Sequence, residues 1–316
     1  MANKYPLVIK SGQLVELQLG DSINDNHPVW YGTRGVFGGG YTSAAVGTID
    51  YVTISTTGNA VSFGQLTVAR YYLAACSNGT RGVFGGGYSA SYYVNTIDYI
   101  TISTTGNATY FSDLTLDKSY LAACSNGTRG IFGGGYLASY VNTIDYITIA
   151  TTGNATYFGD LTVARGYLAA CSNGTRGIFG GGYSTTNTID YITIATTGNA
   201  VAFGQLTVAR GYLAACSNGT RGIFGGGYSA SYVNTIDYIT IATTGNATYF
   251  GDLTVVRNSV AACSNGIRGV FGGGYLLAAA AAVNTIDYIT ISTTGNATYF
   301  GDLTVARYNL AACSGN

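Results

Sequence analysis

Arg34-Gly-Val-Phe-Gly-Gly-Gly-Tyr41 is the segment that decides the fold, because nearly the same eight residues return along the whole chain. Further copies begin at Arg81, Arg129, Arg176, Arg221 and Arg268, and they differ only in having Val or Ile at the third position. Successive copies are 47, 48, 47, 45 and 47 residues apart. A period of this length is typical of β-propellers, in which each repeat forms one blade.

Each repeat contains four segments with the composition of β-strands. In the second repeat these segments are Leu73–Cys76, Arg81–Phe84, Asn95–Ser103 and Ala108–Phe111, separated by turn residues such as Asn and Gly. The turn Thr104–Asn107 predicts a hairpin between the third and fourth strands. Apolar residues do not recur at helical spacing, so the sequence predicts an all-β fold with four-stranded blades.

The ends of the repeat array predict how the ring closes. Six copies of the second, third and fourth strands are present, but the blade of Arg34–Phe63 lacks a first strand directly before it. Leu310–Cys313 repeats the first-strand sequence at the far end of the chain. We therefore expect a six-bladed propeller whose C-terminal strand completes the first blade, which removes exposed sheet edges. In the alternative, His27–Trp30 takes that place and the last strand is spare.

The repeat resembles the kelch repeat. The likeness rests on Val83-Phe-Gly-Gly86, Asp98-Tyr99, Phe111-Ser-Asp-Leu114 and the basic Lys118. The usual kelch Trp is replaced by Phe111, and the order of the acidic residue and the tyrosine is altered. The resemblance covers residues 32–316 and implies a propeller, but kelch-like propellers include enzymes, adaptors and adhesins, so it does not define a function.

Residues 1–31 lie outside the repeats and are expected to form a β arm. Two strand-like runs, Tyr5–Lys10 and Gln13–Leu19, flank Ser11-Gly12. Two strands alone are marginally stable, so this arm should pack on the propeller, on a second copy or on another protein. Residues 6–23 also resemble segments of bacteriophage tail-fibre and other virion proteins. That resemblance implies assembly or anchoring by residues 1–31, while the repeats place the propeller domain over residues 32–316.

Composition narrows the choice of partners and compartment. The formal net charge is zero and 9% of the residues are charged, so no basic field attracts nucleic acid. The apolar run Leu276–Val283 is too short to cross a bilayer, and the N-terminus lacks the pattern of a secretory signal. We expect a protein made in the host cytoplasm and located in the virion, without membrane insertion.

The cysteines follow the repeat, one in each Ala-Ala-Cys-Ser segment. Equivalent positions on separate blades are too far apart for disulfides, so buried free thiols are expected. A ring of thiols that binds a soft metal in the axial channel is the less favoured alternative. The residues concerned are Cys76, Cys124, Cys171, Cys216, Cys263 and Cys313.

Acidic and basic residues also recur once in each repeat and are expected to have structural roles. An aspartate shares a face of each third strand with apolar residues, and a carboxylate in such a position requires a partner. The aspartates are Asp50, Asp98, Asp145, Asp190, Asp237 and Asp287. The candidate partners are either the series Arg34, Arg81, Arg129, Arg176, Arg221 and Arg268 or the series Arg70, Arg165, Arg210, Arg257 and Arg307, with Lys118 in the remaining repeat.

The loops between the second and third strands differ most among the repeats and should all emerge on one face. Tyrosine and serine give adaptable contact surfaces at low entropic cost. Tyr92, Tyr93, Tyr140 and Tyr232 are therefore the predicted contact residues, and Leu276 and Leu277 a predicted apolar patch. Loops that merely connect the strands are the alternative interpretation.

The sequence lacks the residue sets of the common catalytic sites. The single histidine, His27, lies outside the repeats and is interpreted as a packed linker residue, and Cys/His metal spacings are missing. A galactose-oxidase-like enzyme would need clustered His, Tyr and Cys ligands. We predict no enzymatic activity and no cofactor.

We predict a bacteriophage virion structural or attachment protein. Residues 1–31 would bind other virion proteins or copies of the same chain, and the propeller loops a neighbouring subunit, a host-surface receptor or a glycan. A cellular kelch-like interaction scaffold and a glycan-binding, lectin-like propeller are the alternatives.

Overall fold

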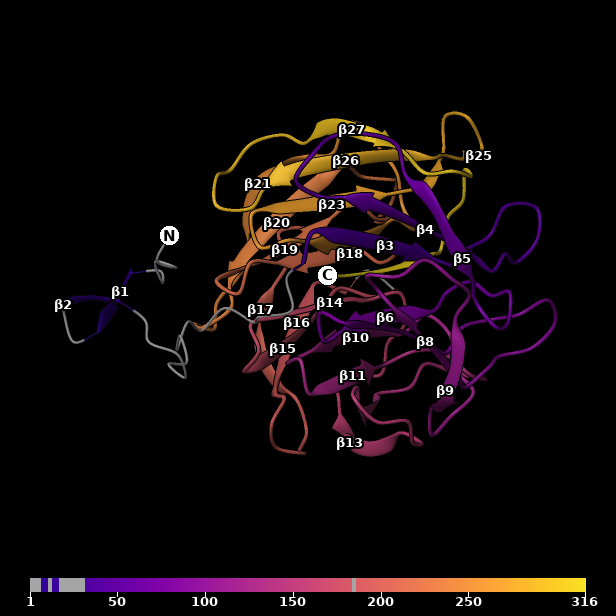
Figure 1. The fold of residues 1–316 in the computed structure, drawn as a ribbon, viewed down its shortest axis with the longest axis horizontal. Coiled ribbons are helices and arrows are strands. Elements are labelled where there is room, and N and C mark those ends of the chain that lie inside the picture. The colour runs from indigo at the N-terminus through magenta and orange to yellow at the C-terminus, as the bar shows by residue number, and fades with distance from the viewer. Residues whose placement is uncertain (1–6, 11–12, 17–31, 184–185) are drawn as a thin grey trace, which may run out of the picture.

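Each repeat forms one four-stranded antiparallel sheet, and six such sheets stand around a common axis as the blades of a β-propeller (Figure 1). The computed structural model describes residues 7–10, 13–16, 32–183 and 186–316. From the innermost strand outward, blade 1 consists of β28 (Ala311–Gly315), β3 (Arg34–Gly38), β4 (Thr48–Thr53) and β5 (Val61–Gln65), and blade 2 of β6 (Ala74–Ser77), β7 (Arg81–Gly85), β8 (Thr96–Thr101) and β9 (Thr109–Asp113). In the same order, blade 3 consists of β10 (Ala122–Ser125), β11 (Arg129–Gly133), β12 (Thr143–Thr148) and β13 (Thr156–Asp160), and blade 4 of β14 (Ala169–Ser172), β15 (Arg176–Gly180), β16 (Thr188–Thr193) and β17 (Val201–Gln205). Blade 5 consists of β18 (Ala214–Ser217), β19 (Arg221–Gly225), β20 (Thr235–Thr240) and β21 (Thr248–Asp252), and blade 6 of β22 (Ala261–Ser264), β23 (Arg268–Gly272), β26 (Thr285–Thr290) and β27 (Thr298–Asp302).

The hydrophobic core consists of layers between neighbouring blades. In the layer between blades 1 and 2, Val36 and Ile49 pack with Phe84 and Ile100 of the next blade. Equivalent apolar clusters occur at the other blade interfaces. Because both faces of each sheet are covered in this way, the second strand of every blade is buried beyond its first residue.

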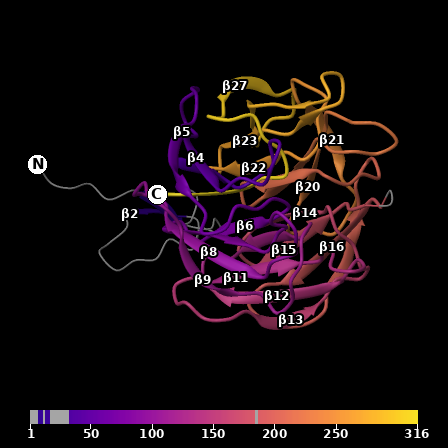
Figure 2. The same cartoon turned by 90° about the vertical axis from the view of Figure 1, so that its right-hand side faces the viewer.

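The C-terminal strand closes the ring. β28 pairs antiparallel with β3, with Cys313 opposite Val36, and therefore forms the innermost strand of blade 1. The Asn316 Oδ1 atom accepts a hydrogen bond of 2.7 Å from the Thr33 backbone N–H. The pairing of β28 with β3 confirms the predicted closure. The innermost position of blade 1, which the alternative assigned to His27–Trp30, is therefore occupied by β28. His27–Trp30 itself lies outside the described residues. The first and last repeats lie side by side in both views (Figures 1 and 2).

The connection between the third and fourth strands is longer than the predicted hairpin. In blade 2 the fourth strand begins at Thr109, because the preceding residues bond to another blade. The backbone N–H groups of Gly106 and Ala108 donate to the carbonyls of Phe63 and Gln65 on β5. The connection thus covers the outer edge of the preceding blade, where an unpaired strand would otherwise be exposed.

Within the N-terminal segment, the structure describes a short antiparallel pair of strands. β1 (Leu7–Lys10) pairs with β2 (Gln13–Glu16), with Val8 opposite Val15. These strands fall within the two runs that the sequence predicts. The described part of the chain contains no helix long and apolar enough to span a membrane.

Candidate functional site

The loops between the second and third strands and the connections from each fourth strand to the next blade emerge on the same face of the propeller. We call this surface the loop face. The loops begin with glycines that take left-handed backbone conformations, such as Gly39 with a φ of 68° and Gly40 with a φ of 118°. A Cβ on Gly39 would lie 2.6 Å from the carbonyl oxygen of Arg70. Glycine is therefore needed where the connection crosses the loop.

The innermost residues of the loop face form a ring around the axis. Each connection contributes one residue just before its buried leucine or valine, and the six backbones join through hydrogen bonds of 2.8–3.0 Å, each N–H donating to the carbonyl of the preceding blade. All of these residues have φ values between 57° and 61°. We call them the axial ring: Tyr72, Tyr120, Tyr167, Tyr212, Ser259 and Asn309.

The side chains of the axial ring surround a hollow with a cavity volume of about 70 Å³. The tyrosine rings lie against one another, with centroids 3.9 Å apart between Tyr72 and Tyr120 and 4.0 Å apart between Tyr120 and Tyr167. Leucine side chains and Val260 line the hollow below them. Ser259 and Asn309 interrupt this aromatic wall at two neighbouring positions, so the hollow has one polar side.

A wider network of tyrosines covers the loop face outside the axial ring. Ring contacts lead from Tyr41 through Tyr308, Tyr275 and Tyr232 to Tyr228, and then to the axial ring at Tyr212. On the other side, contacts also join the following tyrosines into the network: Tyr71, Tyr88, Tyr93, Tyr136, Tyr140 and Tyr183. More than half of the 28 tyrosines in the chain therefore belong to one connected surface.

The environment of this network opposes negative charge. Burial, followed by the influence of neighbouring phenols, raises the pKa of Tyr71 and of Tyr140 to about 12. Burial likewise raises the pKa values of Tyr72 and Tyr167 in the axial ring. Among the described residues of the loops and connections, Asp117 is the one exposed charged residue, since the basic residues there are buried in ion pairs. Four partly exposed aspartates end the fourth strands at the rim of this face: Asp113, Asp160, Asp252 and Asp302. The loop face is thus a surface of aromatic rings and hydroxyl groups around the axis, with carboxylates at its outer rim.

The predicted contact residues all lie on the loop face, with different exposure. Tyr92 is 62% exposed and Leu277 is 55% exposed, while Leu276 is partly buried in β24 (Tyr275–Leu276), which pairs with β25 (Ala281–Ala282). Tyr93, Tyr140 and Tyr232 are partly buried within the tyrosine network. The sequence does not predict the axial ring, because these residues belong to no motif and directly precede the first strand of each blade.

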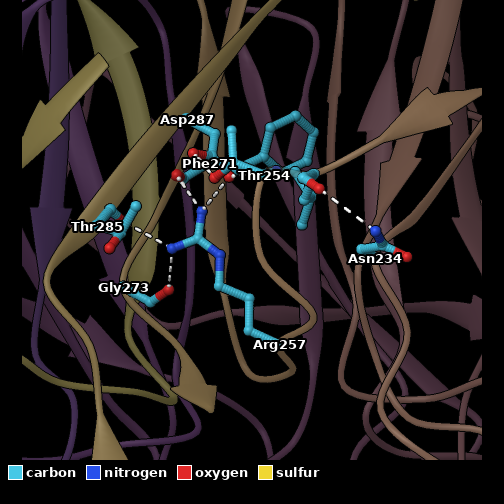
Figure 3. A network of polar contacts seen from close by, with 8 residues as sticks. Asn234, Thr254, Arg257, Phe271, Gly273, Thr285 and Asp287 are labelled. Atoms are coloured by element: carbon cyan, nitrogen blue, oxygen red, sulfur yellow. Dashed lines mark hydrogen bonds and ion pairs between the residues drawn. The ribbon is translucent and has the colours of Figure 1, made fainter. Parts of the chain in front are cut away.

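The third-strand aspartates are buried and paired across the blade interfaces. Figure 3 shows one of these networks, in which Arg257 donates to the Asp287 carboxylate at 2.9 Å and to the carbonyls of Gly273, Thr285 and Phe271. The Thr254 hydroxyl donates to the other carboxylate oxygen at 2.6 Å. In the remaining interfaces the pairs are Arg307 with Asp50, Arg70 with Asp98, Lys118 with Asp145, Arg165 with Asp190 and Arg210 with Asp237.

The Arg34 series makes different contacts from those of the aspartate partners. The Arg34 guanidinium lies 4.6 Å above the ring of Tyr51 in its own blade and donates to the carbonyls of Ile102 and Ser103 in the next blade. Equivalent cation–π contacts occur in all blades. Of the two candidate series, the aspartates therefore pair with the one that includes Arg70. The Arg34 series instead links neighbouring blades on the opposite face of the propeller.

The cysteines are free and buried, as the repeat positions predicted. Burial raises the pKa of the Cys216 and Cys313 thiols to about 12, which keeps them protonated at neutral pH. Each sulfur lies against a glycine of the next blade, and a Cβ on Gly177 would be 2.8 Å from the Cys124 Sγ atom. Among the described residues, no group of three or more His, Cys, Asp or Glu side chains is arranged to hold a metal ion.

The fold is a β-propeller, and its loop face is a surface rich in aromatic rings. No protein-family model matches this chain, and no curated protein is significantly similar to it. The function therefore has to be argued from the site itself.

Proposed function

We propose that this chain is a non-enzymatic binding protein of a bacteriophage virion, which attaches through its loop face to a neighbouring subunit or to the host surface. The observation that carries the proposal is the connected tyrosine network on that face. Tyrosine gives large contact area with little loss of side-chain entropy and adds a hydroxyl group for hydrogen bonding. A surface of this kind suits recognition of a partner better than transfer of protons or electrons.

The variation among the repeats supports a binding role for the loops. Contacts between blades are repeated almost unchanged around the ring, as the six ion pairs show. The loops differ in length and composition, from Ser89–Val94 with two tyrosines to the apolar Leu276–Val283. Selectivity for a partner therefore belongs to the loop face.

The assignment to a virion rests on the N-terminal segment. Residues 6–23 resemble segments of tail-fibre and other virion proteins, and a strand pair in this segment offers edges for assembly with other chains. We propose that residues 1–31 anchor the protein in the particle and leave the loop face free. A cellular interaction scaffold is the second candidate, since its loop face would serve equally well.

The test compares two sets of variants in the intact chain. The double substitution Tyr92→Ser and Tyr93→Ser removes two tyrosines of the loop face, and we expect at least about a tenfold loss of adsorption, because aromatic anchors dominate many interfaces. Tyr110→Ser is the matched control, since Tyr110 is 53% exposed on β9, away from the loop face. Equal adsorption of all three proteins to host cells and to purified particles would refute the role of the loop face.

A separate experiment tests whether the protein is part of the virion. Antibodies against the propeller should label purified virions, and deletion of residues 1–31 should abolish incorporation while the propeller itself is still produced. Unlabelled virions, together with a partner captured on the loop face inside cells, would favour the cellular scaffold instead.

A further inference from the structure

The face of the propeller opposite the loop face carries only positive side chains. This surface, which we call the base face, is formed by the turns between first and second strands and the connections between third and fourth strands, and these segments contain no acidic residue. Every second strand begins there with a partly exposed arginine of the Arg34 series. Within the described residues, these guanidinium groups donate through Nη1 to backbone carbonyls and form no ion pair. The base face therefore keeps six positive charges.

The loop face carries the opposite charge at its rim. Phenol hydroxyls contact three of its carboxylates, as Tyr110 does in donating to Asp113 at 2.8 Å, but no cation pairs with them among the described residues. All other charged side chains of residues 32–316 belong either to the base face or to the buried ion pairs. A net charge of zero thus conceals a separation of charge along the propeller axis. The rim carboxylates are Asp113, Asp117, Asp160, Asp252 and Asp302.

Blade 6 adds an exposed apolar residue to each of these faces. Leu277 is 55% exposed on the loop face, in the apolar loop Leu276–Val283. Ile267 is 68% exposed in the turn before β23 on the base face. The other blades have threonine at the position of Ile267, namely Thr33, Thr80, Thr128, Thr175 and Thr220. Both faces of one blade therefore carry an apolar side chain that the other blades lack at these positions.

These features are complementary between two copies of the chain, provided that unlike faces meet. Contact between two base faces or between two loop-face rims would bring like charges together, which opposes association. Contact of a base face with a loop face brings the arginines toward the carboxylates. With blade 6 above blade 6, the same contact places Ile267 of one copy over the apolar loop that contains Leu277 in the other.

We propose that copies of this chain stack head to tail along the propeller axis, with the base face of one copy on the loop face of the next. Blade 6 sets the rotational register, so successive copies have the same orientation. A head-to-tail contact without a closing rotation generates an open rod. This inference rests on the proposed binding of a neighbouring subunit by the loop face, and it names a second copy of the chain as that subunit. The loop face of the last copy stays free for the host surface.

Sedimentation velocity of the full chain at several salt concentrations tests the stacking. Charge attraction between faces is screened as the Debye length falls from about 30 Å at 0.01 M salt to about 3 Å at 1 M. We expect a series of species larger than the monomer at low salt, and at least about tenfold weaker association at high salt. A chain that stays monomeric at low salt would overturn the proposal. A single dimer that does not grow would indicate contact between like faces and would overturn it too.

A pair of variants, each with one altered face, tests the direction of the contact. The loop-face variant neutralises the four strand-end aspartates as glutamine, the residue that blades 1 and 4 have at this position in Gln65 and Gln205. The base-face variant carries Thr80→Glu, Thr175→Glu and Ile267→Glu, at exposed positions directly before arginines, and leaves those arginines in place.

Each variant alone should associate at least about tenfold more weakly than the unaltered chain. A mixture of the two should form a one-to-one pair and nothing larger, because one intact base face and one intact loop face remain. A mixture without this pair, or unchanged stacking by either variant alone, would refute the head-to-tail contact.

Ile267→Thr is the mildest test, because it restores the residue of the other blades. Loss of the exposed apolar side chain should weaken stacking at least about threefold. Val201→Thr is the matched control, since Val201 is 54% exposed on the outermost strand of blade 4 and Thr109 is its equivalent in blade 2. Equal effects of the two substitutions would exclude a specific role of Ile267 in the register.

Failure of this inference can be distinguished from failure of the proposed function. If the chain is monomeric at every salt concentration but Tyr92→Ser with Tyr93→Ser reduces adsorption, the loop face binds another partner and stacking is wrong. If salt-sensitive stacks form but those substitutions leave adsorption to host cells and particles unchanged, stacking stands and the attachment role fails.

Discussion

Arg257 illustrates how a buried charge is tolerated at the interfaces between blades. Burial lowers the pKa of its guanidinium, and the nearby Asp287 carboxylate offsets part of that effect. Three backbone carbonyls from the next blade accept further hydrogen bonds. A buried ion pair is not a large net source of stability, but removal of one partner leaves an uncompensated charge.

Replacement of Arg257 by methionine should therefore be strongly destabilising. We expect the free energy of unfolding to fall by about 3–5 kcal/mol, because Asp287 would remain buried without its cation. Chemical denaturation followed by circular dichroism measures the change. The double variant Arg257→Met with Asp287→Asn should recover part of the loss. A double variant that is less stable by the sum of the two single effects would show that the charges do not interact.

For the buried charges, the sequence predicts that each aspartate has a cationic partner but not which residue that partner is. The sequence indicated that each third-strand aspartate needs a cation, and the structure provides one in every blade. The sequence did not distinguish the Arg34 series from the series of Arg70, because both recur once in each repeat. The choice depends on how neighbouring blades meet: Arg70 follows the outer strand of blade 1 and reaches Asp98 in blade 2.

Gly177 and Cys124 offer a second test, since the two residues fit together across a blade interface. A methyl group on Gly177 would approach the Cys124 sulfur to 2.8 Å, so Gly177→Ala should lower the free energy of unfolding by about 1–3 kcal/mol. The additional substitution Cys124→Ala makes room for that methyl group. We expect the double variant to be more stable than the sum of the single effects by more than about 0.5 kcal/mol. Strict additivity in denaturation curves would contradict this contact.

β28 differs from the innermost strands of the other blades because it joins the two ends of the repeat array. It supplies the innermost strand of blade 1, and its residues also contact the next blade, where the Ser77 hydroxyl donates to the Ser314 carbonyl at 2.6 Å. Repeats that depend on nearest neighbours gain stability when no terminal face is left open.

Deletion of residues 310–316 should open the ring. Leu310, Ala311 and Cys313 are buried, and loss of a buried leucine alone costs about 2–5 kcal/mol. We expect the melting temperature to fall by more than about 10 °C, given the usual relation between stability and melting temperature. The uncovered edge of β3 should also promote association, which light scattering detects. A truncated chain with an unchanged melting temperature would show that β28 is dispensable.

At the scale of elements, the strand order was predictable and the connections were not. Periodicity and turn residues gave four strands in each repeat and the closing strand. Nothing local indicated that Gly106–Ala108 would bond to the preceding blade, because a Thr-Thr-Gly-Asn segment is also a good hairpin turn. The sequence also does not predict the left-handed backbone of the axial-ring tyrosines, because that conformation is imposed by the ring of backbone hydrogen bonds around the axis.

In the whole molecule, hydrogen bonds connect neighbouring blades both near the axis and at the outer edge of the ring. Backbone hydrogen bonds connect the axial ring on the loop face, and serine hydroxyls such as that of Ser125 donate to the preceding blade at the other end of the axis. The connections between third and fourth strands bond at the outer edge. The loop face is therefore presented on a support held together by many hydrogen bonds, which would lower the entropic cost of the proposed binding.

The tyrosine network should give this support a characteristic response to alkaline pH. In the unfolded chain a phenol has a pKa near 10, whereas in the folded protein the pKa values of Tyr71 and Tyr140 are raised to about 12. The folded state thus keeps protons that the unfolded state releases, so the stabilisation that these two phenols contribute is fully present below about pH 10 and is lost as the pH rises toward 12. Phenolate absorbance should increase at higher pH in the native protein than in denaturant, and the melting temperature should decline over the same interval. Coincident titration curves for the native and denatured protein would contradict a desolvated tyrosine network and weaken the case for the proposed binding role of the loop face.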